Sequence, residues 1–170
     1  MKKVIRIVFL QVLVSSILCL VSCNSNVESV MGEYAYKASG QLTYDGLREF
    51  FYEESGELEF IYLQKDSVLL SFVATEGGVF TTTASVEGNK VYLSPCSRML
   101  SLSYTETDKG ILTGTVNRTE TLNFKVGVYG EGSIYGESIL FELQYSGTEL
   151  ESGNKLRGNQ ITMVAKKKRS

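Results

Sequence analysis

The residue types that most often act in catalysis or bind metals are histidine, cysteine and the acidic residues. This 170-residue chain has 3 Cys and 19 Asp and Glu. The sequence contains no histidine, which excludes histidine-based triads, histidine general bases and histidine-ligated zinc sites. Cys96 therefore has no histidine to lower its pKa, and its setting in Ser94-Pro95-Cys96-Ser97 indicates a half-buried loop thiol, not a nucleophile. We predict no catalytic residue and no enzymatic activity.

The acidic residues are densest at Glu53, Glu54, Glu57 and Glu59. A calcium site would need several carboxylate oxygens, but the Asp-x-Asp-x-Asp-Gly spacing of a calcium loop is missing. Glu57 and Glu59 alternate with apolar residues, which favours the water-exposed face of a strand. Phosphate-binding glycine loops are also missing. The sequence thus predicts neither a metal site nor a cofactor.

Charge separates the two ends of the chain from its middle. The sequence has 17 Lys and Arg against 19 Asp and Glu, but Lys2, Lys3 and Arg6 lie at one end and the basic run 166–169 at the other. The part between them is strongly acidic, which argues against a nucleic-acid partner. We predict a basic tail over residues 166–170, either solvated or in contact with anionic lipid headgroups.

Residues 1–22 have the pattern of a secretory signal peptide: a basic start, an apolar stretch from Ile7 to Val21, and a small residue at Ser22. The apolar stretch is shorter than the roughly 20 residues that a membrane-spanning helix needs. The tetrad Leu20-Val21-Ser22-Cys23 resembles the lipobox of bacterial lipoproteins. In that family, the cysteine thiol receives diacylglycerol, the chain is cut before the cysteine, and the new amine is acylated, for example with palmitate.

The resemblance implies a protein anchored to a membrane by lipid on Cys23, because two or more acyl chains anchor a protein stably. Cys19 would leave with the signal peptide, so Cys96 would have no partner for an internal disulfide. Residues 23–31 would then be the lipidated cysteine and a polar tether. An Asp directly after the lipidated cysteine resembles an inner-membrane retention signal. This chain has Asn24 at that position, which favours the outer membrane. Which side of that membrane the protein faces stays open.

From Gly32 onward the dominant hydrophobic period is two, which is typical of strands with one face in a core and one in water. The strand-like runs are 33–38, 58–63, 68–74, 79–86, 90–93, 100–104, 122–128, 139–145 and 161–165. Asp45-Gly46 predicts a type I′ hairpin turn. Leu47, Phe50 and Phe51 have helical spacing, but their aromatic character and the preceding turn favour a strand.

Nine to eleven short antiparallel strands in one domain, residues 32–165, predict an all-β fold, either a closed up-and-down barrel or a two-sheet β-sandwich. We favour the barrel, because Gly32-Glu33-Tyr34 resembles the Gly-x-Trp start of the lipocalins and their calycin relatives. In that family the aromatic ring closes the barrel floor beneath a basic side chain from near the last strand. The resemblance gives this role to Tyr34, with Arg157 or Lys155 as the basic residue.

A barrel of this size encloses either packed side chains or one small ligand. Our first hypothesis is a binding or carrier protein for a small apolar or amphipathic ligand. The alternatives are an accessory lipoprotein that contacts another envelope protein, and a hydrolase that uses two carboxylates. The candidate ligand-binding residues are Tyr34, Leu102, Tyr104, Phe124 and Phe141. Asp66-Ser67-Val68 also resembles a bacterial O-glycosylation motif.

Overall fold

The computed structural model describes residues 27–75, 78–110 and 114–169. The predicted signal peptide and Cys23 lie outside these residues. A short helix, α2 (Val27–Val30), precedes eight strands. In chain order they are β1 (Gly32–Tyr44), β2 (Arg48–Gln64), β3 (Ser67–Ala74), β4 (Gly78–Glu87), β5 (Lys90–Gly110), β6 (Gly114–Tyr135), β7 (Ser138–Glu149) and β8 (Lys155–Lys167).

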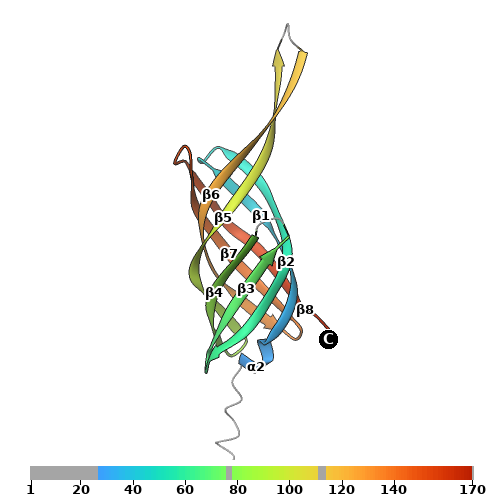
Figure 1. The fold of residues 1–170 in the computed structure, drawn as a ribbon, viewed down its shortest axis with the longest axis vertical. Helices are drawn as coiled ribbons and strands as arrows, with labels where there is room; N and C mark the ends of the chain where they lie inside the picture. Colours follow the sequence, from blue (N-terminus) through green and yellow to red (C-terminus); the bar gives the residue numbers. More distant parts are fainter. Residues whose placement is uncertain (1–26, 76–77, 111–113, 170) are drawn as a thin grey trace, which may run out of the picture.

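The strands form one antiparallel sheet that closes into a ring, because each strand pairs with its neighbours along the chain and β1 pairs with β8 (Figure 1). The all-β class and the up-and-down barrel are therefore confirmed, and the sandwich alternative is excluded. The described residues form eight strands, fewer than predicted, because runs 90–93 and 100–104 belong to a single strand. In β5 a bulge between Leu93 and Cys96 shifts the register and joins the two runs.

The inside of the barrel is a hydrophobic core. Alternate residues of each strand point inward and are mostly apolar, while the residues between them are exposed and mostly polar. The largest fully buried side chains include Tyr34, Tyr36, Phe60, Phe124, Phe141, Leu42, Leu58 and Leu70. Ring contacts such as the stacked pair Phe72 and Phe80, with centroids 4.4 Å apart, fill the space between the walls.

The first hairpin forms as the Asp-Gly signal predicts. Asp45 and Gly46 both have positive φ, 51° and 71°, as a type I′ turn requires. The Leu47 N–H donates to the Tyr44 carbonyl at 3.1 Å, and β2 begins at the next residue, Arg48. The segment with helical spacing is therefore strand, as we favoured.

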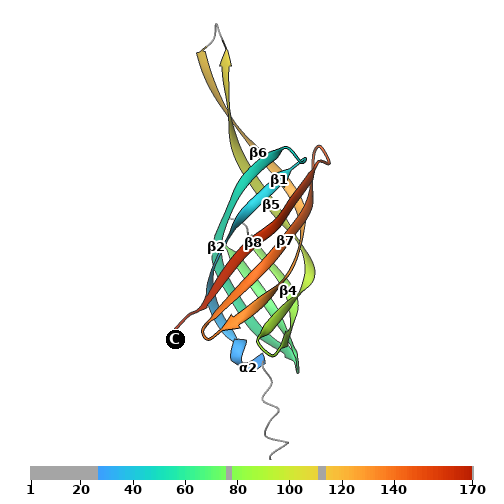
Figure 2. The ribbon, with the colours of Figure 1, turned by 180° about the vertical axis from the view of Figure 1, so that it is seen from behind.

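Helix α2 closes the lower end of the barrel, the end at which it is drawn in Figures 1 and 2. The side chains of Val27 and Val30 are completely buried, and the Tyr34 hydroxyl donates a hydrogen bond to the Val30 carbonyl at 3.0 Å. Residues 27–30 thus belong to the folded body, although the sequence placed them in the polar tether. Val27 and Val30, three positions apart, form the apolar face of the helix that packs on the core.

The basic side chain near the last strand is Lys167, not Arg157 or Lys155. Its Nζ lies over the Tyr34 ring, 5.8 Å from the centroid, and 3.5 Å from the Ser29 carbonyl. Lys155 and Arg157 pair with the opposite end of β1 and with β7, far along β8 from Tyr34. A cation therefore lies over the Tyr34 ring, but it belongs to Lys167 at the end of β8 and to neither residue that the sequence indicated.

The basic run at the C-terminus takes part in the fold. β8 continues to Lys167, beyond the predicted domain limit at residue 165. The Lys168 N–H donates to the Glu33 carbonyl at 2.8 Å, and its ammonium lies 2.6 Å from the Glu57 carboxylate. These contacts tie residues 167 and 168 to β1 and β2, so only the last residues remain as a tail. Among the described helices, none is long and apolar enough to cross a bilayer.

The upper end of the barrel is uneven. β5 and β6 pair as far as Gly110 and Gly114, and their hairpin projects well beyond the other strands (Figures 1 and 2). The β3–β4 hairpin, by contrast, ends at Ala74 and Gly78, level with Gly56 of β2. The wall between β2 and β5 is therefore shorter than the rest of the ring.

Candidate functional site

A gap in the barrel wall lies above the β3–β4 hairpin. β2 pairs with β3 only from Gly56 onward, so residues 48–54 have β1 as their strand partner and no strand on the other side. β5 pairs with β4 only over residues 90–93. Within the described residues, the edges of β2 and β5 thus face each other above the β3–β4 hairpin. Below that point β3 and β4 lie between them.

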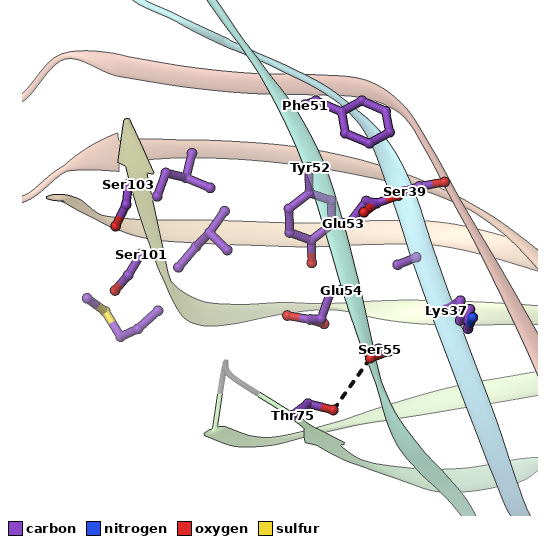
Figure 3. A pocket seen from close by; sticks show the side chains of 14 residues that line it. Lys37, Ser39, Phe51, Tyr52, Glu53, Glu54, Ser55, Thr75, Ser101 and Ser103 are labelled. Carbon is purple, nitrogen blue, oxygen red and sulfur yellow. Dashed lines mark hydrogen bonds between the residues drawn. The ribbon is translucent and has the colours of Figure 1, made fainter. Parts of the chain in front are cut away.

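A cavity of about 730 Å³ occupies this gap (Figure 3). Its wall combines inward-facing and outward-facing side chains, because the cavity passes through the sheet. It is lined by Lys37, Ala38, Ser39, Phe51, Tyr52, Glu53, Glu54, Ser55, Thr75, Met99, Leu100, Ser101, Leu102 and Ser103. Tyr52, Leu100 and Leu102 supply the apolar inner surface, while serine hydroxyls line the outer rim.

The polar floor of the cavity is a buried ion pair. Glu54 points inward from β2, and the Arg98 guanidinium comes from β5. Two guanidinium nitrogens contact the carboxylate: Nη1 lies 2.8 Å from Oε1, and Nη2 contacts Oε2. The two side chains are 9 % and 2 % exposed, respectively. The Tyr36 hydroxyl donates to Glu54 Oε1 at 2.9 Å, and Arg98 also lies over the Phe80 ring at 4.5 Å.

Two tyrosines extend this polar cluster. The hydroxyls of Tyr52 and Tyr145 lie 3.4 Å apart, inside the barrel. Burial raises the pKa of both, so both hydroxyls keep their protons at neutral pH. Burial by itself lowers the pKa of Arg98, but its hydrogen bonds to Glu54 and the charge of Glu54 outweigh this and leave the pKa raised. The guanidinium is therefore charged.

The cluster offers more donors than acceptors. The Arg98 Nε–H is buried and has no hydrogen-bond partner. In the Tyr52–Tyr145 contact only one hydroxyl can donate to the other, so the second O–H has no acceptor within the pair. A buried donor without a partner is costly. Of the residues that supply these donors, Tyr52 lines the cavity, so a group in the cavity that accepts a hydrogen bond could pair with its hydroxyl.

The predicted ligand-binding residues are spread over the barrel. Leu102 lines the cavity. Tyr104 lies above it, where the Arg48 guanidinium covers its ring at 4.2 Å and its hydroxyl bonds to Glu120. Tyr34, Phe124 and Phe141 are at most 2 % exposed and belong to the core. The structure therefore brings one of the five to the cavity.

The acidic cluster divides between the two faces of β2. Glu54 points inward to Arg98, while Glu53 and Glu59 point outward and Glu57 pairs with Lys168. In the part of the chain that the structure describes, no group of three acidic or cysteine residues could hold a metal ion. The interpretation of all four as a solvated face was therefore wrong for Glu54.

Cys96 lies in β5 opposite Val128 and not in a loop, because the bulge at residues 94 and 95 continues the strand. It is a free, half-buried thiol. Burial raises the pKa of the Cys96 thiol. A hydrogen bond with Thr82 and the charge of Arg98 lower it, but they offset only part of the effect of burial. A thiol of this kind is a weak nucleophile at neutral pH.

Sequence reasoning missed Glu54 and Arg98, the two residues that define the floor. A signal for each was present. Glu54 has the same parity as Tyr52 and Leu58, and Arg98 the same parity as Leu100. A charged residue at an inward position of each of two strands, with opposite signs, predicts a buried ion pair.

Comparison with known proteins gives resemblances in fold. No protein-family model matches the chain, and no curated protein matches it in sequence. Among solved structures, a redesigned beta barrel, b11L5F_LGL, is 10 % identical, with 85 % of this chain and 96 % of that chain covered and a TM-score of 0.42. EF1p2_mFAP2b bound to DFHBI is 8 % identical, with 86 % and 100 % covered and a TM-score of 0.48. The redesigned barrel mFAP1, also bound to DFHBI, is 10 % identical at a TM-score of 0.38, with 85 % and 100 % covered.

Proposed function

We propose that this protein is a lipid-anchored protein of the bacterial envelope that binds a small amphipathic ligand in the cavity between β2 and β5. The observation that carries the proposal is the cavity itself, a space of about 730 Å³ in the barrel wall between β2 and β5. Binding sites for small molecules commonly enclose about 300–1,000 Å³ and combine apolar walls with a few polar groups. This cavity has both.

The lining defines the chemistry of the ligand. Leu100, Leu102 and the ring of Tyr52 would contact an apolar body, because these side chains face the cavity from the inside. The hydroxyl of Tyr52, which lines the cavity, would donate a hydrogen bond to a carbonyl, ether or phenol oxygen at the buried end. Glu54 is neutralised by Arg98, so a charged head is not required.

The proposed anchor agrees with the geometry of the lower end. Val27 follows Cys23 by four residues, which span at most about 14 Å when extended. Lipid on Cys23 would thus hold the lower end of the barrel close to the membrane surface. The β5–β6 hairpin projects from the other end (Figure 1), and the cavity lies on that side of the β3–β4 hairpin. We propose the outer membrane as the location, because the residue after Cys23 is Asn24 and not the Asp of an inner-membrane retention signal.

A hydrolase is the less suitable function for this cavity. Glycosidase chemistry needs two carboxylates that face each other across a cleft. Glu53 and Glu54 both line the cavity, but they are adjacent in β2 and so point to opposite faces of the wall. The proposed function therefore has no catalytic step.

Ligand binding is tested by native mass spectrometry of protein purified from its own envelope, together with thermal unfolding across fatty acids, sterols and hydrophobic dyes. A ligand that binds only the folded state raises the melting temperature. Tyr52→Phe removes a donor from the cavity and should reduce this shift, while Tyr62→Phe, at an exposed outward position, should not. No co-purifying ligand and no thermal shift with any probe would overturn the proposal.

Anchoring is tested separately by intact-mass measurement of membrane-extracted protein. The expected product begins at Cys23 and carries added acyl mass. Cys23→Ser should give an unlipidated product, because the acceptor thiol is lost. A mature chain that begins elsewhere, or one without acyl mass, would refute the anchor and leave the ligand site unaffected.

Contact with another envelope protein is a second candidate function, and it rests on a different observation. Phe51 on β2 and Met99 on β5 point outward at the two sides of the gap, and they are 73 % and 50 % exposed. Large apolar side chains beside an opening in a barrel wall are typical of surfaces that another molecule covers.

A further inference from the structure

The edge of β5 that faces the gap has free backbone groups whose direction can be worked out. The Leu150 N–H donates to the Asn123 carbonyl at 2.9 Å, so the outward-facing residues of β6 direct their backbone groups toward β7. The inward-facing residues of β6 therefore pair with β5, and Leu100 lies directly opposite Phe124. The outward-facing residues of β5 between them direct their N–H and C=O groups into the gap. These are Ser97, Met99, Ser101 and Ser103.

The opposite edge, on β2, has the same arrangement. The Thr75 N–H donates to the Ser55 carbonyl at 2.9 Å, which shows that outward-facing residues of β2 direct their backbone groups toward β3. Above Ser55 that side has no strand in the described residues, so Glu53, Phe51 and Glu49 direct theirs into the gap.

The two edges differ in how they are protected. Exposed strand edges invite pairing with another chain, and proteins usually block them with charges, prolines or bulges. The β2 edge has two glutamates. On β5, the bulge and Pro95 mark only the beginning of the edge. The following residues 97–103 present serines and Met99 on the outer face, with no charge.

We propose that the β5 edge, residues 97–103, binds an extended segment of another protein as an added strand. The inner face beside this edge is apolar at Leu100 and Leu102, so the partner has apolar residues at every second position. Its remaining residues point outward toward Glu49 and Glu53 across the gap, and charge complementarity makes them lysine or arginine. This inference goes beyond the proposed ligand, because it uses the backbone edge and not the buried polar cluster; both occupants would contact Leu100 and Leu102, so they would compete for the gap.

A second copy of this chain fits the gap less well. Pairing β5 with β5 of another copy would place serines and Met99 beside the glutamates of β2 and would add no positive charge. It would also have to accommodate a second barrel next to the β3–β4 hairpin. A single added strand occupies only the β5 side of the gap.

The probe is a synthetic peptide of about nine residues, the length of an ordinary strand, that alternates valine with lysine. The full chain in detergent should bind it, and the backbone amides of Met99, Ser101 and Ser103 should gain protection from hydrogen exchange. The matched control peptide has the same side chains but carries N-methyl groups on alternate backbone nitrogens. Because it cannot complete the ladder, it should bind at least about tenfold more weakly.

Ser101→Pro is the decisive variant, because it removes an N–H that points into the gap and leaves the β5–β6 ladder intact. It should weaken the peptide about tenfold. Thr121→Pro is its matched control: Thr121 lies on the other edge of the same hairpin, above the part of β6 that pairs with β7. Peptide affinity should be unchanged in Thr121→Pro. Glu53→Lys should also weaken the lysine peptide and favour a glutamate version.

Three results would overturn the proposal. Equal binding of the parent and N-methylated peptides would show that backbone pairing is not involved. Equal affinities of Ser101→Pro and Thr121→Pro would show that binding occurs elsewhere. Dimerisation of the protein that is abolished by Ser101→Pro, without peptide binding, would assign the edge to a second copy.

Discussion

Removing the charge of Glu54 or of Arg98 alone should destabilise the barrel far more than removing both charges together. The Glu54 and Arg98 side chains are 9 % and 2 % exposed, and the Glu54 carboxylate accepts hydrogen bonds from two nitrogens of Arg98. Glu54→Gln leaves a buried guanidinium without its counter-ion, and Arg98→Met leaves a buried carboxylate. Loss of one partner of a buried ion pair costs about 3–5 kcal/mol. The double variant Glu54→Gln/Arg98→Met should be much closer to the parent than either single variant, because neither charge remains to be solvated.

The assay is equilibrium unfolding in denaturant of the parent, the two single variants and the double variant. The coupling free energy of the cycle should exceed the cost of either single variant and approach the sum of the two, because the double variant is close to the parent. The pH dependence separates the two singles. In Arg98→Met the stranded carboxyl can take up a proton, so the loss of stability should be smaller near about pH 5 than near about pH 8. In Glu54→Gln the guanidinium keeps its charge at both pH values.

The reasoning would be refuted if either single variant lost less than about 1 kcal/mol, the value typical of exposed ion pairs. That result would mean that water reaches the pair from the cavity and solvates each charge alone. Additive effects of the two single substitutions would lead to the same conclusion.

Three further predictions concern other parts of the barrel. Val30→Ala should lower the free energy of unfolding by about 2–3 kcal/mol in denaturant titrations, because Val30 is completely buried; no change would show that α2 is not part of the cooperative unit. Gly56→Ala should cost about 1–3 kcal/mol, since the new Cβ would lie 2.2 Å from the Val73 carbonyl oxygen. Gly88→Ala, in an open turn with φ of +59°, should cost only about 1–2 kcal/mol. Cys96 should react with a thiol reagent more slowly than free cysteine near neutral pH, because burial raises its pKa.

The strands themselves were predictable because each has one wet and one dry face. Period two located every strand of the described chain, and Asp45-Gly46 located the first turn. The strand count was not predictable in the same way. The bulge after Leu93 changes which residues of β5 face inward, so one strand has two sequence patterns of opposite parity. Cys96 was assigned to a loop for this reason.

The candidate site was less predictable than the fold. The gap depends on the unequal lengths of hairpins, and no single residue signals where β3 ends relative to β2. Glu54 and Arg98 lie 44 positions apart and meet only after the ring has closed. A cluster of glutamates suggested one solvated face, whereas parity alone separates Glu54 from Glu53. Leu102, by contrast, was found because an inward apolar residue also serves as cavity wall.

The pairing of β1 with β8 affects the order in which the protein folds. Every other ladder joins neighbours in the chain and so closes a short loop, but this one joins the two ends. Because a chain is made from its N-terminus, β1 must wait with one unpaired edge until the last residues are available. The ladder of β8 with β1 extends from Leu156 to Lys167, and the Lys168 N–H continues it with a bond to the Glu33 carbonyl. A truncation that removes β8 (Lys155–Lys167) would therefore leave the ring open, with β1 exposed to pairing with other unfinished chains.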